Sequence, residues 1–213
     1  QWSWRAQFAW GRVKGSDEKS ASPTHIDNQF RYIRNLHFRN DIYELTVTGR
    51  FDFIDPEKAN KVFYKRTNKL VPYVTFGLGV FYHSPKALSP EPNDGAPNPE
   101  AEWEVGKWTS LQEIGTEGQG RTYTVTDADG NTTEESFGKK YSKVQLAIPL
   151  GIGVRKKISQ RIDISFEFSY RYLLTDYLDD VSGLYIDQGY FGNDPEGNLA
   201  KAFHDRSREG GRR

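Results

Sequence analysis

The sequence contains no cysteine, and its four histidines are scattered along 213 residues. The lack of thiols excludes a disulfide framework, a cysteine nucleophile and a cysteine-based zinc site, and scattered histidines make a poor metal cluster. Lys and Arg together number 29, as do Asp and Glu, so the net charge gives no electrostatic reason to expect nucleic acid. We therefore expect no metal, no cofactor and no nucleic-acid partner.

The chain also lacks methionine, and no apolar run approaches the ~20 residues that a membrane-spanning helix needs. Its mean hydropathy of −0.76 agrees with this, so a helical membrane protein is excluded. The first residue is Gln and no signal-like segment follows it, which predicts that the natural chain begins further upstream.

Aromatic residues make up 14% of this polar chain, so its apolar side chains must be concentrated in a few segments. Five segments alternate with a period of two residues, and each has one apolar face and one polar or small face. These segments are residues 1–11, 43–53, 73–83, 143–155 and 161–172. They are longer than the usual ~5–6 residue strand and match the ~9–11 residues with which a tilted strand crosses a bilayer. They are predicted to be long β-strands.

The polar faces of these segments are informative about the direction in which the apolar faces point. They combine charges of both signs with small residues, and the charged members are Arg5, Glu44, Arg50, Asp52, Arg155, Arg161, Asp163, Glu167 and Arg171. Such a mixture suits a narrow lumen in which charges pair away from lipid, and a solvent-exposed sheet face would also tolerate it. The length of the strands and the unequal lengths of their connections predict that the apolar faces point outward to lipid. A soluble sandwich or lipocalin, with its apolar face inward, remains the alternative.

The connections between the segments alternate in length. Those at Asp55–Lys69 and Lys157–Gln160 fall on one side, and the long loops at about 84–140 and 174–213 fall on the other. Short periplasmic turns with long external loops are typical of outer-membrane barrels. Such barrels have an even number of at least eight strands and no open edge in hydrocarbon. Five strands are too few, so either weak strands lie in the loops or the chain is a fragment.

Three short motifs are candidates for chemistry. Asp127–Asn131 resembles a calcium loop faintly, but its glycine is misplaced for an EF-hand, and Thr-rich flanks favour a hairpin turn. Thr116–Gly120 has glycines that suit a backbone with positive φ, and it is not a phosphate loop. Thr175–Ser182 carries three carboxylates that could bind a cation, perform acid/base work or pin a loop; pinning is the default interpretation. The candidate functional residues are Glu117, Gln119, Asp176, Asp179 and Asp180.

Several strings together resemble one known family. They are Arg34–Asn40, Pro72–Phe81, Thr116–Gly120, Ile148–Gly153 and Thr175–Ser182. On these strings the chain, over roughly Trp2–Arg208, is similar to the PorG-like family of small outer-membrane β-barrels, components of the type IX secretion system. The resemblance implies an all-β, antiparallel, up-and-down transmembrane barrel of eight strands. The five strands here would be strands three to seven, in a single domain (1–213) truncated at both ends.

The resemblance also implies a location and partners. The barrel would lie in outer-membrane lipid, and its periplasmic side would associate with a ring lipoprotein and associated secretion proteins. On this interpretation Asp55–Lys69 and Lys157–Gln160 are the partner surfaces. A lumen of eight strands is just filled by side chains, so no open pore is expected.

Three functions follow as hypotheses. The first is a non-enzymatic structural role in a type IX-like secretion machinery, anchoring the periplasmic ring. The second is a barrel whose external loops bind a ligand or a cell-surface molecule. The third is an outer-membrane enzyme that uses Asp176, Asp179 or Asp180, although no catalytic constellation accompanies these residues.

Overall fold

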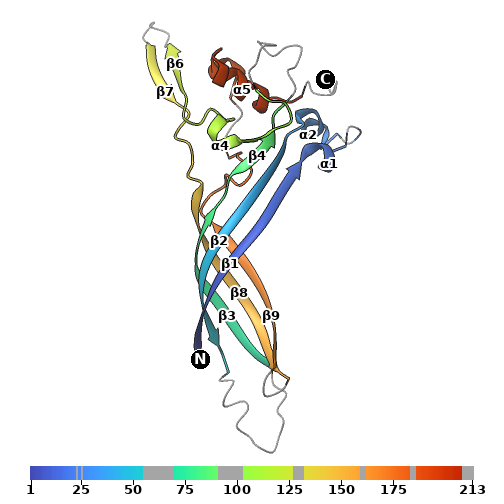
Figure 1. The fold of residues 1–213 in the computed structure, drawn as a ribbon, viewed down its shortest axis with the longest axis vertical. Helices are drawn as coiled ribbons and strands as arrows, with labels where there is room; N and C mark the ends of the chain where they lie inside the picture. The colour runs from blue at the N-terminus through green and yellow to red at the C-terminus, as the bar shows by residue number, and fades with distance from the viewer. Residues whose placement is uncertain are drawn as a thin grey trace, which may run out of the picture. The chain divides into compact units, whose positions relative to one another are not determined.

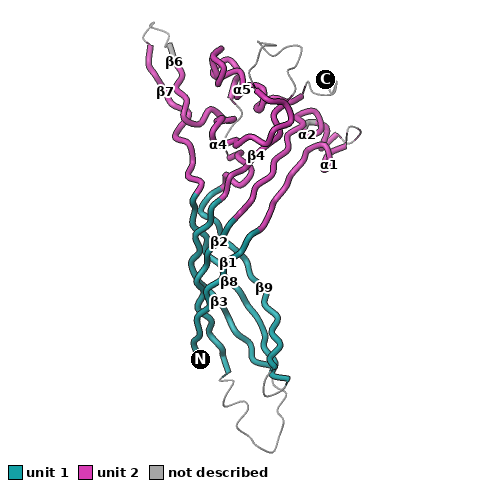
Figure 2. The backbone as a smooth tube through the Cα atoms, viewed as in Figure 1, with its two compact units in different colours: residues 1–10, 43–82, 144–175 teal, residues 11–42, 83–143, 176–213 magenta. Residues whose placement is uncertain are grey.

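The computed structural model describes residues 1–22, 24, 26–54, 70–90, 103–126, 132–158, 162–182 and 186–207. Strands make up 51% of the structure and helices 16%, which confirms a mostly β fold built on an antiparallel sheet. The chain divides into two compact units (Figure 2). Unit 1 comprises residues 1–10, 43–82 and 144–175, and unit 2 comprises residues 11–42, 83–143 and 176–213.

Unit 1 is built on five long strands (Figure 1). They are β1 (Trp2–Ser16), β2 (His37–Asp52), β3 (Leu70–Tyr82), β8 (Val144–Lys157) and β9 (Asp163–Leu173), and the ends of β1 and β2 belong to unit 2. The strand order is β1-β2-β3-β8-β9, so each long strand pairs with the next one along the chain. All five alternating segments are therefore strands, in the predicted order.

The sheet of unit 1 curls into a half barrel, and small residues on its inner face allow close approach. A Cβ atom on Gly77 would lie 2.1 Å from the carbonyl oxygen of Val47, on the paired strand β2. Gly153 lies opposite Tyr73, and a Cβ there would lie 2.4 Å from the tyrosine ring. Glycine at position 77 permits the close approach of β2 and β3, and glycine at position 153 leaves space for the ring of Tyr73.

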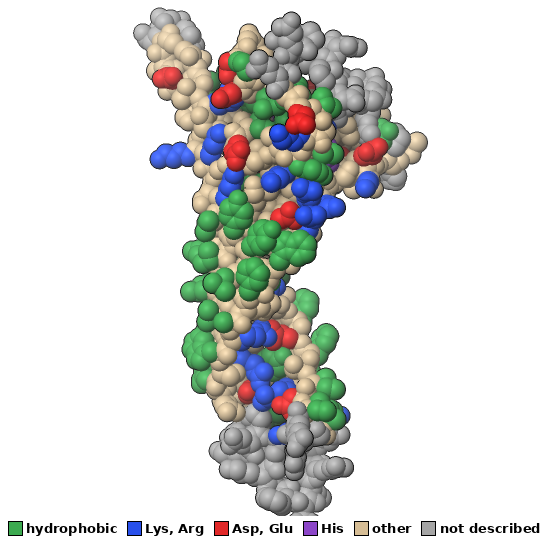
Figure 3. Space-filling view, viewed as in Figure 1, with side chains coloured by type: hydrophobic (Ala, Val, Ile, Leu, Met, Phe, Trp, Pro, Cys, Tyr) green, Lys and Arg blue, Asp and Glu red, His purple; other side chains and the backbone are tan. Residues whose placement is uncertain are grey.

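Burial in unit 1 is the reverse of that in a soluble sheet. Alternate residues on the apolar face are exposed, such as Leu78 (67%), Ile152 (64%) and Phe166 (73%). The opposite face buries polar side chains, among them Thr46, Thr48, Asp52 and Thr75. In Figure 3, hydrophobic side chains project along the strands of unit 1, and charged side chains gather in the hollow of the sheet.

Unit 2 has a conventional apolar core surrounded by short elements. These are α1 (Asp17–Ser20), α2 (Gln29–Arg34), β4 (Pro85–Leu88), β5 (Trp108–Ser110), α4 (Leu111–Ile114), β6 (Thr122–Thr126), β7 (Thr132–Ser136), η1 (Gln188–Phe191) and α5 (Pro195–His204). The core cluster comprises Ala87, Leu111, Ile114, Phe191, Ala200 and Phe203, with Phe38, Ile186 and Leu199 packed against it. Parts of the two segments that were predicted as long loops thus form helices and short strands around this core.

Local signals explain where some of these elements begin. Helix α5 starts at Pro195, and the side chain of Asp194 accepts a hydrogen bond from the backbone N–H of Gly197 as its N-cap. Strands β6 and β7 pair antiparallel, with Thr126 opposite Thr132, which confirms the predicted hairpin. The calcium-like stretch Asp127–Asn131 between them lies outside the described residues, as do Asp55–Lys69, Ser159 and Gln160.

Among the helices that the structure describes, none combines the length and the apolar character that a membrane crossing requires.

Candidate functional site

Two motifs that are far apart in the sequence dock against each other in unit 2. The carboxylate of Glu117 accepts a hydrogen bond from the backbone N–H of Ser182, with 3.1 Å to Oε2. The hydroxyl of Thr116 donates to Oδ2 of Asp180 over 2.6 Å. Gly118 and Gly120 have φ of 82° and 79°, as predicted for this loop. The structure thus brings the 116–120 and 176–182 segments together.

Most of the candidate residues pin these two segments. Gln119 is buried, and its side-chain oxygen accepts the backbone N–H of Glu117 over 2.9 Å. Oδ1 of Asp179 accepts the backbone N–H of Val181 over 3.3 Å, and Asp176 accepts the hydroxyl of Ser182 over 3.4 Å. These bonds are those that the loop-pinning interpretation predicts.

Asp180 is the buried centre of the docked motifs. It is 1% exposed and has a left-handed φ of 75°. Its Oδ1 accepts a hydrogen bond from the hydroxyl of Tyr141. The ring of Tyr141 stacks with those of His83 and Tyr177, at centroid distances of 5.7 and 4.5 Å. The carboxyl is therefore held by a closely packed polar and aromatic environment.

This environment changes the acidity of Asp180. Burial raises its pKa to about 7, against the opposing effect of the hydroxyl donors of Thr116 and Tyr141. The neighbouring carboxylates of Glu117 and Asp179 raise the pKa further by repulsion. The docked motifs therefore favour the protonated form of Asp180.

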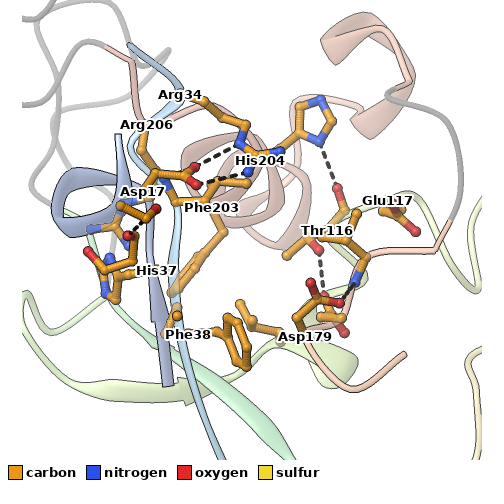
Figure 4. Close-up of a pocket in the computed structure, with 18 residues that line it drawn as sticks. Asp17, Arg34, His37, Phe38, Thr116, Glu117, Asp179, Phe203, His204 and Arg206 are labelled. Atoms are coloured by element: carbon orange, nitrogen blue, oxygen red, sulfur yellow. Dashed lines mark hydrogen bonds and ion pairs between the residues drawn. The ribbon is translucent and has the colours of Figure 1, made fainter. Parts of the chain in front are cut away.

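A cavity of about 200 Å³ lies beside these motifs, entirely within unit 2 (Figure 4). Its apolar lining comes from the core: Phe38, Ala87, Leu111 and Phe203. Thr116, Glu117, Asp179, Asp180 and Val181 form one wall, so the candidate residues Glu117, Asp179 and Asp180 line the cavity, and Gln119 and Asp176 do not.

Two arginines line another part of the cavity. Arg34 forms a bidentate ion pair with Asp17, with distances of 2.8 and 3.0 Å, and Asp17 also accepts the backbone N–H of Leu36. Arg206 is 5% exposed and donates to the carbonyl oxygen of Leu88 over 2.6 Å. Both guanidinium groups therefore line the same cavity as the docked motifs.

Two histidines complete the polar lining. Nε2 of His37 accepts the backbone N–H of Leu88 over 3.1 Å. Burial, followed by the charge of Arg206, lowers the pKa of His37 to about 4, so its ring is neutral at physiological pH. The Nδ1–H group of His204 donates to the carbonyl oxygen of Thr116 over 2.8 Å. This bond ties the end of α5 to the docked motifs.

Sequence reasoning missed Asp17, Arg34, His37, His204 and Arg206 as site residues. They lie on three segments that are far apart in the chain, around Asp17, Arg34 and His204. Arg34 and His37 belong to a recognised string, but the string does not indicate their proximity to Arg206. The Asp194-Pro195 pair would have indicated a helix that carries His204 towards the core.

Unit 1 has a second polar region on its inner face. Arg5 on β1 forms a bidentate ion pair with Glu167 on β9, at 2.8 and 3.2 Å, and Tyr73 also donates to Glu167 over 3.2 Å. Arg171 pairs with Glu44 at 2.9 Å. A cavity of about 240 Å³ lies among these groups. These four charged side chains of the inner face therefore form ion pairs with one another.

Within the described ranges, His, Asp and Glu side chains form no group of three that could hold a metal ion. Comparison of the chain with models of protein families, with curated proteins and with solved structures finds no match.

Proposed function

We propose that this chain is part of an outer-membrane β-barrel with a non-enzymatic, structural role in a type IX-like protein secretion machinery. The observation that carries the membrane part is the burial pattern of unit 1. Its sheet exposes an apolar face and buries polar and charged side chains on the opposite face. In a bilayer this arrangement places apolar side chains against acyl chains and ion pairs in the lumen.

Transfer free energies favour contact of the exposed apolar face with lipid over contact with water. Transfer of one Leu, Ile or Phe side chain from water to an apolar environment gains roughly 1.5–3 kcal/mol. More than ten large apolar residues on β3, β8 and β9 are exposed, including Leu78, Ile152 and Phe166. A monomeric soluble protein rarely exposes so continuous an apolar surface. The free energy of burying this face supports membrane insertion.

The secretion role rests on the resemblance to the PorG-like family. On that basis the chain lies in the outer membrane and anchors a periplasmic ring lipoprotein with its associated proteins. The paired charges of Arg5, Glu44, Glu167 and Arg171 occupy the inner face, which supports a filled lumen and a structural role over bulk transport.

Recovery of the ring lipoprotein with the affinity-tagged full-length protein tests this role. We expect recovery from detergent-solubilised outer membranes with the wild type, and loss of recovery when Asp55–Lys69 is scrambled. The matched control scrambles Asp127–Asn131, a connection that the alternation of the strands places on the other side of the membrane. Equal recovery from all three proteins would refute the proposed partner surface.

A second candidate function is ligand binding by the external part of the barrel. The cavity of unit 2 favours it, because three of the five candidate residues line a space that is bounded by an ordered core. Secretion that continues normally when the residues of this cavity are replaced would favour the second function over the first.

A further inference from the structure

We propose that unit 2 carries a binding site for the phosphate group of an outer-leaflet lipid, formed by Arg39 and Lys86 and supported by Trp108. The three residues belong to β2, β4 and β5, and all of them lie in unit 2. None of them lines the cavity beside the docked motifs. The inference rests on the membrane location proposed above, and it does not depend on the secretion role.

Two basic side chains lie opposite each other on paired strands. Arg39 on β2 is the partner of Lys86 on β4, and directly opposite residues of an antiparallel pair share one face of the sheet. Like charges in this arrangement repel each other. Among the residues that the structure describes, neither side chain forms an ion pair with Asp or Glu. An anion bound by both side chains would compensate their repulsion.

The nearest acidic residue on this face is already paired. Asp41 follows Arg39 by two residues, so it lies on the same face of β2. Its carboxylate forms a bidentate ion pair with Arg12, at 2.5 and 3.0 Å. Hydrogen bonding to Arg12 lowers the pKa of Asp41, against the opposing effect of burial, and the charges of Arg39 and Lys86 lower it further. Three cationic groups thus act on one carboxylate, which leaves positive charge in excess around it.

Trp108 fixes the position of the Arg39 guanidinium. Cζ of Arg39 lies 4.0 Å from the centroid of the Trp108 ring, which is the geometry of a cation–π contact. Nε of Arg39 is buried, and the side chain donates no hydrogen bond within the described part of the chain. A guanidinium held against a ring presents its N–H groups along its edge, where they match two oxygens of a phosphate.

The order of side chains along β2 indicates a lipid as the source of the phosphate. Beyond Arg39 on the same face come Tyr43, Leu45 and Val47, and all three are exposed. Tyr43 lies opposite Tyr82, which is also exposed. In membrane proteins, aromatic residues lie at the level of the lipid headgroups, between the apolar surface and the basic residues that bind headgroup phosphates. The same order from apolar to aromatic to basic side chains occurs along this strand.

The leaflet follows from the direction of the strands. Lys86 and Trp108 belong to the segment 84–140, which the alternation of the connections predicts to be external. The external leaflet of an outer membrane consists mainly of glycolipids whose sugar headgroup carries phosphate groups, the lipid A class. A phosphate on this headgroup combines the negative charge and the attached acyl chains that this face of β2 would accept.

Native mass spectrometry of the full-length protein in an uncharged detergent tests the assignment. The probes are lipid A and enzymatically dephosphorylated lipid A, and inorganic phosphate serves as the competitor. We expect lipid A to bind with at least about fivefold higher affinity than its dephosphorylated form, because each basic residue near a charged headgroup strengthens binding by about that factor. Inorganic phosphate at millimolar concentration should not displace lipid A, since it lacks the acyl chains.

Variants locate the binding. Arg39→Gln and Lys86→Gln should each weaken binding of lipid A about fivefold, and Arg39→Lys should weaken it less, because it keeps the charge and loses the paired donors. Lys139→Gln is the matched control: Lys139 is an exposed basic residue of unit 2 that does not act on Asp41, so affinity should be unchanged. Binding of dephosphorylated lipid A should be equal in all four variants and the wild type, which reports that each variant is folded.

Three results would overturn the proposal: equal affinity for lipid A and its dephosphorylated form, displacement of lipid A by millimolar phosphate, or equal effects of Arg39→Gln and Lys139→Gln. Extraction of the wild type from membranes is measured in parallel. A protein that leaves the membrane only with detergent but does not discriminate between the two lipids contradicts the phosphate site alone. A protein that leaves the membrane without detergent contradicts both this site and the proposed membrane location.

Discussion

Asp180 illustrates how single residues hold unit 2 together. Its carboxyl is almost completely inaccessible to water and accepts hydrogen bonds from Thr116 and Tyr141. These two residues come from other parts of the chain, so one side chain joins three segments. Because the pKa is raised in the folded state, folding of unit 2 binds a proton at this site.

The pH dependence of stability follows from this linkage. The ordinary pKa of Asp180 is 3.8, and burial raises it to about 7 in the folded state. Its contribution to stability is therefore full below pH ~4 and is lost as the pH rises towards ~7, by up to about 4 kcal/mol. Asp180→Asn should remove this dependence. The measurement is hydrogen-exchange protection of the 116–120 amides between pH 4 and 8, corrected for intrinsic rates; parallel profiles for wild type and variant would contradict it.

The candidate residues show what sequence can and cannot predict about a site. Glu117, Asp179 and Asp180 stand out in short unusual strings, and the structure places all three at one cavity. Arg34 and Arg206 were not predicted as site residues. They are far apart in the chain and are brought to the same cavity only by the folding of unit 2, which no local sequence pattern indicates. The sequence therefore singled out three acidic residues that line this cavity and did not indicate the two arginines that line it with them.

The long strands are the elements that alternation predicts best. All five were placed, but β1 continues to Ser16 and β2 begins at His37, outside the alternating segments. In these extensions the strands enter unit 2, where the period-two pattern of apolar residues ends. The core of unit 2 was not predicted, because Ala87, Leu111 and Phe203 are separated in sequence and follow no period.

Pairing of β2 with β3 depends on the absence of a side chain at Gly77. An added methyl group there would meet the Val47 carbonyl oxygen and Cα of Thr48, both of which are backbone atoms that cannot rotate away. Gly77→Ala should therefore destabilise the sheet by about 1–3 kcal/mol, as overpacking does. Urea unfolding in detergent measures this change.

The matched control for this substitution is Gly11→Ala, since a Cβ atom on Gly11 has no neighbour within 4 Å. It should leave stability unchanged or raise it by a few tenths of a kcal/mol, up to about 1 kcal/mol, through the unfolded chain. Equal destabilisation by both substitutions would contradict the claim that the close approach of the strands at Gly77 causes the loss of stability.

For unit 1 as a whole, the central question is whether its apolar face is in contact with lipid. Period-two alternation is the same for a soluble sandwich and for a membrane barrel, so it does not by itself decide the direction of the apolar face. In the structure Thr48 and Asp52 are buried and Ile164 and Phe166 are exposed, which is the direction that strand length and the unequal connections predict.

Site-directed fluorescence measures this direction most directly. The chain has no cysteine, so single-cysteine variants carry a probe at one position only. Probes at Ile152, Ile164 and Phe166 in liposomes should be quenched by nitroxide-labelled lipid and protected from aqueous iodide. Probes at Thr48 and Ser169 on the inner face should be insensitive to the lipid quencher. Outer-face probes that iodide quenches and labelled lipid does not would contradict the membrane barrel.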